Sequence, residues 1–587
     1  MRALPGISHI AAGLLAALLG CGALAAAPGL TADRAPASAP PGLAPVAPPP
    51  GSFIVLSYHE VRDEVRDYPD PYAVDSGALV AQFAWLRGSG YAPVSLQAII
   101  DARNGGKSLP PKAVLLTFDD GYLSFYTRVY PLLRVFGYPA LLAVVGKWID
   151  EPPQADQLYG EKATVGSAAF PTWAQLREMA GSGLVEMASH SYDLHRGILA
   201  NPQGNVEPAA TARLYDAASG SYENDAQWRA RVRDDMERNS ALIARQTGQR
   251  PRAMVWPYGS YNDELVRIAG ELGMPVDITL NDGVNTPQVP LSAMRRLLVI
   301  HNPPLANFTG EVIGPPVPPP VRVVEVGLDQ VVDADPARQE QKLSALLDRV
   351  LALGVTHVFL HAFSDSGAGA APQAYFATQS MAMRADLFNR VAWQLSTRTD
   401  VKVCAAIPPS LLRMPPAAAA AIVQDLARGS NFEGLYFMPT GPGEAADSAA
   451  MVAASARLAQ AARKWRAPLL VARGIAQADA SAQTIASISA GADWVVLAQL
   501  RGAPPVAHFA GGDAAALAAG QPRLVVLLDG AGDGGALRAG AALSERMRGL
   551  QRAGAVNFGF RDDDFLRDEP PLAQIAPALS VRDTTFR

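Results

Sequence analysis

Short apolar runs alternate with helix-like stretches along most of this 587-residue chain, and that alternation limits the folds open to it. Seven runs come first, at 53–58, 113–118, 140–145, 185–189, 253–256, 277–280 and 297–300. Eight more follow a proline-rich segment, at 321–326, 357–363, 401–407, 435–438, 469–472, 494–500, 524–528 and 556–560. Strands that alternate with helices predict mainly parallel sheets. Eight of them in series predict a closed (β/α)8 barrel, with an open doubly wound sheet as the alternative.

The proline-rich segment Gly-Pro-Pro-Val-Pro-Pro-Pro at 314–320 is typical of a stiff, extended linker. It places one α/β domain at 52–313 and a second at 321–587. We expect an irregular (β/α)7 barrel in the first and a (β/α)8 barrel in the second. Active sites in such barrels lie where the strands end, so the residues that follow each run are the candidates for chemistry.

The N-terminus is typical of an export signal. Arg2 precedes an apolar run at 10–19 that is too short to span a bilayer, and Leu-Leu-Gly-Cys then ends at Cys21. This ending resembles the lipobox of bacterial lipoproteins, which predicts a signal peptide at 1–20 and lipidation of Cys21. A secretory signal cleaved after the alanines at 24–27 is the alternative. Residues 21–51, rich in proline and alanine, would then be a tether.

Overall charge argues against a nucleic-acid partner. The chain has 50 Lys and Arg against 55 Asp and Glu, a net charge of −5, and we find no basic stripe. Its two cysteines imply no disulfide framework, and Cys404 inside an apolar run is expected to be a buried hydrophobic residue.

Two motifs in the first domain indicate a metal site. The apolar run at 113–118 leads directly into Asp119, Asp120 and Gly121, and a bend there would let both carboxylates share one site. After the run at 185–189 come His190 and His195, whose spacing fits a loop that curls back. Two imidazoles and one carboxylate suit Zn²⁺ and leave a position for water. Two surface histidines beside an unrelated acidic turn are the alternative.

Together these motifs resemble those of the polysaccharide deacetylase family, carbohydrate esterase family 4. The resembling stretches are Thr-Phe-Asp-Asp-Gly-Tyr at 117–122, Ser-His-Ser-Tyr-Asp-Leu-His at 189–195 and Trp-Pro-Tyr-Gly at 256–259. Leu-Ser-Tyr-His at 56–59, together with 383–388 and 391–395, is similar to the periplasmic deacetylases of poly-β-1,6-N-acetyl-D-glucosamine in biofilm systems. The resemblance implies a deacetylase barrel joined to a glycoside-hydrolase-like barrel.

The resemblance also implies roles for individual residues. Asp120, His190 and His195 would hold a divalent metal, Zn²⁺ or else Ni²⁺ or Co²⁺, with Asp119 as the general base. From the chemistry of amide hydrolysis, we expect the metal and the backbone N–H of Tyr122 to stabilise the tetrahedral oxyanion. His59 is our candidate for the acid that protonates the leaving amine, and His301, which follows the run at 297–300, is the competitor.

The third motif departs from the family pattern. Many members have an arginine immediately before Pro-Tyr, but this chain has Trp256 there, beside Tyr258. Trp256 is expected to stack on a sugar ring or to be buried in the core. Arg252 lies nearby in the sequence, but we do not assign it the missing charge.

In the second domain, related proteins carry an acidic cluster after the fourth strand, where this chain reads Phe-Met-Pro-Thr-Gly at 437–441. Glycoside hydrolysis ordinarily requires two carboxyl groups. Other carboxylates follow strand-like runs, at Asp329, Asp365, Asp529 and 562–564. We therefore expect a degenerate barrel that binds polymer, and a rearranged hydrolase is the alternative.

The motifs thus predict a metal-dependent hydrolase, and the resemblance implies that it is an N-deacetylase of poly-β-1,6-N-acetyl-D-glucosamine. The resemblance implies a periplasmic protein, lipid-anchored to the outer membrane, that works with an export pore. A non-catalytic binding lipoprotein is one alternative, and a deacetylase of chitin, peptidoglycan or xylan is another.

Overall fold

The computed structural model describes residues 48–581, except 67, 69, 151–155, 160–162, 315–319, 365–371, 441–448, 501–522, 531–539 and 553–554. Signal peptide, Cys21 and most of the tether lie outside this range, as do Asp365 and most of the proline linker. The predicted boundaries that fall there stay predictions. No helix within the described part is long and apolar enough to cross a membrane.

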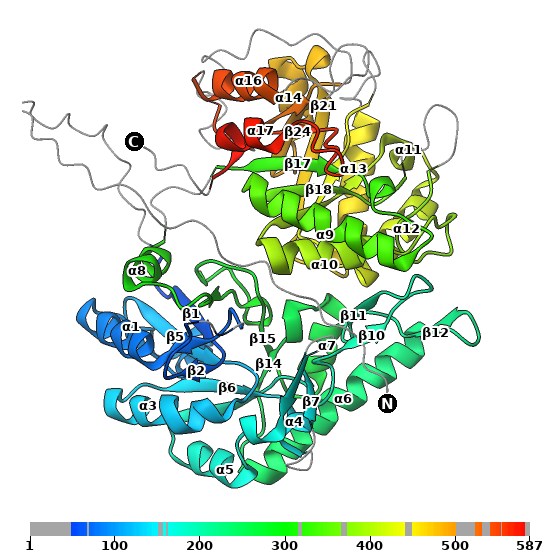
Figure 1. The fold of residues 1–587 in the computed structure, drawn as a ribbon. Coiled ribbons are helices and arrows are strands. Elements are labelled where there is room, and N and C mark those ends of the chain that lie inside the picture. The colour runs from blue at the N-terminus through cyan, green and yellow to red at the C-terminus, as the bar shows by residue number, and fades with distance from the viewer. Residues whose placement is uncertain are drawn as a thin grey trace, which may run out of the picture. The chain divides into compact units, whose positions relative to one another are not determined.

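An open sheet of eight strands forms the first half (Figure 1). Its order is β15-β14-β9-β6-β5-β1-β16, with β4 also paired to β5, and the strands that pair in it are parallel. The strands are β1 (Phe53–Tyr58), β4 (Ala92–Pro93), β5 (Ala113–Phe118), β6 (Ala140–Val144), β9 (Val185–Ser189), β14 (Ala253–Val255), β15 (Val276–Ile278) and β16 (Leu297–Leu298). All seven predicted strands are therefore present.

Helices connect most of these strands, because a parallel neighbour requires a crossover. They are α1 (Ser76–Gly88), α2 (Leu96–Arg103), α3 (Tyr130–Phe136), α4 (Gly146–Asp150), α5 (Trp173–Gly181), α6 (Asp225–Thr247), α7 (Asp263–Glu271) and α8 (Leu305–Ile313). Four small ribbons lie outside the sheet: β2 (Val61–Arg62) with β3 (Val74–Asp75), β7 (Asp156–Tyr159) with β8 (Ala163–Gly166), β10 (Gly197–Leu199) with β11 (Val206–Pro208), and β12 (Tyr215–Asp216) with β13 (Ser221–Tyr222).

The second half is a closed barrel in the order β17 to β24, as predicted. Its strands are β17 (Arg322–Val326), β18 (His357–His361), β19 (Lys402–Ile407), β20 (Gly434–Phe437), β21 (Leu470–Ala476), β22 (Trp494–Ala498), β23 (Arg523–Asp529) and β24 (Phe558–Arg561). The described helices are α9 (Pro336–Leu353), α10 (Phe388–Thr399), α11 (Pro409–Leu412), α12 (Pro416–Gly429), α13 (Ala449–Arg463), α14 (Ala482–Ser489), α16 (Gly540–Arg552) and α17 (Leu572–Leu579).

Strand alternation divides the barrel's apolar side chains between two regions. One cluster fills the interior and includes Val323, Phe359, Cys404 and Tyr436, all buried. A larger cluster lies between the strands and the surrounding helices.

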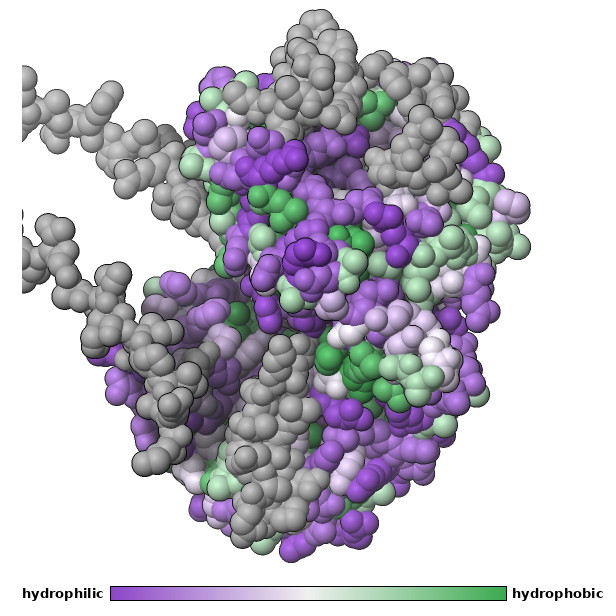
Figure 2. Space-filling view, turned by 45° about the vertical axis from the view of Figure 1, so that its right-hand side comes forward, coloured by the Kyte–Doolittle hydropathy of each residue, from purple (hydrophilic) through white to green (hydrophobic). Residues whose placement is uncertain are grey.

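The face in Figure 2 is mostly hydrophilic, with apolar residues in smaller groups. The two sheets confirm the predicted α/β fold class. The first sheet, however, does not close into a complete barrel, because it remains open between β15 and β16.

Candidate metal-dependent active site

The acidic turn at the end of β5 begins the site. The β5 backbone leaves the sheet at Asp119, whose N–H donates to the Tyr58 carbonyl at 2.9 Å, and the turn follows at once. Asp120 and Gly121 both have left-handed backbone angles, φ 70° and 75°. Glycine tolerates that region readily, whereas an aspartate there is uncommon. The bend buries both carboxylates at the same edge of the sheet.

Three side chains converge beside this turn in the arrangement expected of a metal centre. Asp120, His190 and His195 are buried, and one potential ligand atom from each lies within 4.8 Å of the others. Nε2 of each histidine is 3.3 Å from Asp120 Oδ1. Two imidazoles and one carboxylate match the donor set of a catalytic zinc site. The donor set and its burial therefore fit a divalent metal.

Neighbouring groups orient the two imidazoles. His190 Nδ1 lies 2.7 Å from the Val255 carbonyl, so this nitrogen donates and Nε2 is left for a metal. The His195 ring contacts the rings of Trp148 and Tyr258, whose centroids are 4.8 and 4.5 Å away. Tyr258 itself has a positive φ of 58°, which turns the chain at the third motif.

Asp119 has surroundings suited to a base. Its Oδ2 accepts a hydrogen bond from Arg296 Nη1 at 2.6 Å, while the buried Oδ1 has no hydrogen-bond partner. Burial alone would raise the pKa of Asp119, but the Arg296 guanidinium, His59 and His190 outweigh that effect and lower the pKa below its usual value. The carboxylate is therefore ionised at neutral pH.

Arg296 is the site residue that the sequence analysis missed. It is nearly fully buried and also donates to Ser57 Oγ at 2.9 Å. It supplies beside Asp119 the positive charge that the third motif lacks, because it immediately precedes β16, which pairs with β1. An arginine directly before the last strand-like run was the available signal. Arg252, by contrast, pairs with Glu186 at 2.8 Å.

The two candidate acids are placed differently. His59 follows β1 and its Nε2 is 3.8 Å from Asp119 Oδ2, whereas His301 is exposed, in a turn with φ 56°. Burial lowers the pKa of His59, and the charges of Asp119 and Asp120 oppose this effect. His59 is thus the histidine that lies beside the base.

The aromatic candidates separate into two kinds. Trp256 is fully buried, in a cluster with Met254 and Ile268, so the prediction that it stacks on a sugar is wrong. Tyr258 is partly exposed and stays a candidate substrate contact. Tyr122 is buried, with its ring stacked on Phe170 at 5.8 Å, and its backbone role stays a prediction.

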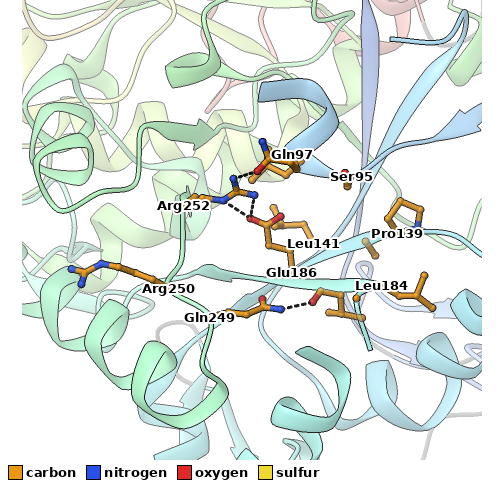
Figure 3. A pocket seen from close by; sticks show the side chains of 13 residues that line it. Ser95, Gln97, Pro139, Leu141, Leu184, Glu186, Gln249, Arg250 and Arg252 are labelled. Carbon is orange, nitrogen blue, oxygen red and sulfur yellow. Dashed lines mark hydrogen bonds and ion pairs between the residues drawn. The ribbon is translucent and has the colours of Figure 1, made fainter. Parts of the chain in front are cut away.

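A cavity of about 380 Å³ lies at the amino-terminal ends of the strands of the first sheet, opposite the carboxyl ends that carry the metal cluster. It is lined by the beginnings of β6 and β9 and by the residues before β14, whereas the metal cluster follows the ends of β5 and β9. Figure 3 shows Arg252 directed at Glu186 and Gln97 across it. These side chains satisfy one another, so we place no chemistry there.

The barrel of the second half has a charged layer near the strand ends. Glu325 Oε1 is 3.0 Å from His361 Nε2 and 3.5 Å from Arg561 Nη2. Of the acidic candidates, Asp329 pairs with Arg384 at 2.8 Å and Asp563 with Arg349 at 2.6 Å. Sequence reasoning did not identify Glu325, because it lies inside a strand-like run and does not follow one.

Comparisons with known proteins agree with this geometry. Residues 106–276 match the polysaccharide deacetylase family model, and residues 325–428 match the model described as hypothetical glycosyl hydrolase family 13. Poly-β-1,6-N-acetyl-D-glucosamine N-deacetylase of Escherichia coli is 39% identical over 359 residues, 61% of this chain and 53% of the relative. Over those 359 residues this chain is homologous to the Escherichia coli poly-β-1,6-N-acetyl-D-glucosamine N-deacetylase. The predicted resemblance is therefore confirmed.

Other relatives each match less than half of this chain. The enzyme of the same name from Staphylococcus epidermidis is 24% identical over 264 residues, 42% of this chain and 79% of that protein. The solved BpsB deacetylase domain from Bordetella bronchiseptica is 52% identical and covers 42% of this chain and 96% of that one, with a TM-score of 0.40. The match spans about half the length of the Escherichia coli relative.

Asp277 in β15 should make the stability of the deacetylase domain depend on pH. It is buried, and this burial holds its pKa well above the usual value, although the neighbouring Trp256 indole N–H lowers it to a smaller extent. The folded state therefore retains a proton that the unfolded chain loses at about pH 3.9. The stability of the folded state falls as the pH rises from there towards the raised pKa of Asp277.

We expect Asp277→Asn to remove this loss, because asparagine keeps the shape without ionising. The melting temperature should rise by about 2 to 4 °C at pH 8, the shift that ~1 kcal/mol produces in a domain of this size, and should differ little at pH 4. Melting curves of both proteins from pH 4 to 8 check this. Asp234→Asn, at an exposed position on α6, is the control. A difference that does not vary with pH would contradict the assignment.

Proposed function

We propose that this protein is a metal-dependent hydrolase that removes N-acetyl groups from poly-β-1,6-N-acetyl-D-glucosamine. The observation that carries the proposal is the convergence of Asp120, His190 and His195 beside an ionised Asp119. A protein that only binds polymer has no need of a base beside a metal site. The names of the curated relatives support the substrate.

The chain's own residues divide the reaction between them. A divalent metal held by Asp120, His190 and His195 would lower the pKa of a water molecule and polarise the acetyl carbonyl. Asp119 takes the water's proton at Oδ1, while Arg296 holds Oδ2 and keeps the carboxylate oriented. The backbone N–H of Tyr122 donates to the developing oxyanion.

Cleavage of the amide C–N bond then requires a proton on the departing nitrogen. His59, whose Nε2 lies 3.8 Å from Asp119 Oδ2, would pass to that nitrogen the proton that Asp119 took from water, so that acetate and a free amine leave. Zn²⁺ suits this donor set, and Ni²⁺ or Co²⁺ can replace it, since imidazole binds all three. The metal's identity is part of the proposal.

For the rest of the protein we propose a supporting role. Lipidation at Cys21, supported by the lipobox-like sequence, would anchor the protein to the outer membrane in the periplasm. The second barrel would hold the polymer, and an export pore would receive it. The absence of a carboxylate at 437–440 argues against ordinary cleavage by that barrel.

Acetate release from a β-1,6-linked N-acetylglucosamine oligomer tests the proposal. The purified protein should release acetate, stop when a chelator is added, and leave the chain length unchanged by mass spectrometry. A β-1,4-linked oligomer of the same length is the matched control and should react more slowly. Faster release from the β-1,4 oligomer would move the substrate to chitin, and shortened chains would show that the second barrel cleaves.

A further inference from the structure

Side chains on one face of α6 hydrogen-bond to the loop that carries both histidine ligands and to the strand end before it. Asp235, Arg238 and Asn239 are spaced i, i+3 and i+4, so they project from the same side of the helix. Asn239 Nδ2 donates to the Val144 carbonyl at 3.0 Å and to Ser189 Oγ at 2.8 Å. These bonds fix the end of β9 immediately before His190.

Arg238 holds the middle of the loop through Tyr192. Its guanidinium carbon lies 3.5 Å from the centroid of the Tyr192 ring, and its Nη2 donates to the Tyr192 hydroxyl at 2.6 Å. This contact fixes the Tyr192 side chain.

Asp235 holds the loop backbone itself. Its Oδ1 accepts the Tyr192 N–H at 2.8 Å, and its Oδ2 accepts the Asp193 N–H at 2.7 Å. Each oxygen of one carboxylate thus satisfies one of two consecutive amides, which fixes the peptide between them in position and direction. Burial raises the pKa of Asp235 to about 6, although both amides lower it, so the group is ionised above neutral pH.

The loop needs such support because its conformation is unfavourable by itself. Ser191 has a φ of 68°, a region that residues other than glycine rarely occupy. The loop is also held by Gly146 and Lys147, whose N–H groups donate to the Ser191 and Tyr192 carbonyls at 3.2 and 3.1 Å. A positive φ persists only where the surroundings fix it.

We propose that Asp235 is a positioning residue which preorganises the metal site by clamping residues 192 and 193 of the loop between His190 and His195. The proposal rests on the metal site of the proposed function. Asp235 is not one of the three ligand groups, and it acts by bringing the two imidazoles to the spacing that a metal requires. Supporting groups of this kind typically contribute 10- to 100-fold to metal affinity.

The test is metal affinity in the full chain at pH 7.5. Asp235→Asn keeps the size of the side chain but turns an N–H group towards one of the two amides. We expect the dissociation constant for Zn²⁺, measured by competition with a chromophoric chelator, to rise about 10- to 100-fold. Amide hydrogen exchange at 192 and 193 should accelerate in the metal-free variant.

Asp234→Asn is the matched control, since Asp234 is the exposed neighbour on α6 and should keep wild-type affinity and exchange. Unchanged Zn²⁺ affinity in Asp235→Asn would overturn the clamp alone, whereas a wild type that binds no Zn²⁺ would overturn the proposed function. If the variant does not fold, exchange in the metal-free wild type decides. Slow exchange at 192 and 193 supports the clamp, and fast exchange contradicts it.

Discussion

Asp119→Asn should lower the kcat/KM for acetate release by about 10²- to 10⁴-fold, the range that general acid–base catalysis contributes. Asparagine cannot take a proton from water at Oδ1. Its amide oxygen can still accept the bond from Arg296, so the buried guanidinium keeps a partner. Steady-state acetate release from the β-1,6 oligomer measures the loss.

Metal content separates this effect from a damaged site. Asp119 is not one of the three ligand groups, so the variant should bind one Zn²⁺ per chain, as the wild type is expected to do. Full activity in Asp119→Asn would mean that another group is the base. Lost metal would mean that Asp119 is itself a ligand.

His190→Ala should lose both stoichiometric metal binding and activity. The substitution removes one of only two nitrogen donors, and the remaining His195 and Asp120 leave a site of two ligands. Equilibrium dialysis against Zn²⁺, followed by the acetate assay, measures both losses.

His301→Ala is the matched histidine control for metal content. His301 follows another strand of the same sheet, but its side chain is exposed, so the variant should bind Zn²⁺ as the wild type does. Retained stoichiometric binding in His190→Ala would contradict the ligand assignment. Loss in both variants would indicate a fold-wide effect.

Much of the architecture is readable from the sequence because the strands of parallel sheets are buried on both faces. The runs at 53–58, 113–118 and 185–189 correspond to β1, β5 and β9 residue for residue. All eight barrel strands were also predicted. The short ribbons β10–β11 and β12–β13 were missed, because two or three residues in an irregular segment carry no clear alternation.

The site was predictable where its residues follow one another in the chain. Asp119 and Asp120 are adjacent, and His190 and His195 share one loop, so the motifs already placed them together. Arg296 lies 177 residues from Asp119, and the two come together only because β1 pairs with both β5 and β16.

Trp256 shows that a residue's place in a motif does not predict where its side chain points. The sequence gives its position beside the motif, but only the packed structure shows that its ring points into the core. Motif position therefore identified the ligand candidates but not the direction of this side chain.

The most direct measurement of the central claim is the Zn²⁺ content and acetate release of the same preparations of wild type, Asp119→Asn and His190→Ala. The account predicts metal with activity in the first, metal without activity in the second, and neither in the third. Acetate release by metal-free wild-type protein, or by His190→Ala, would contradict it.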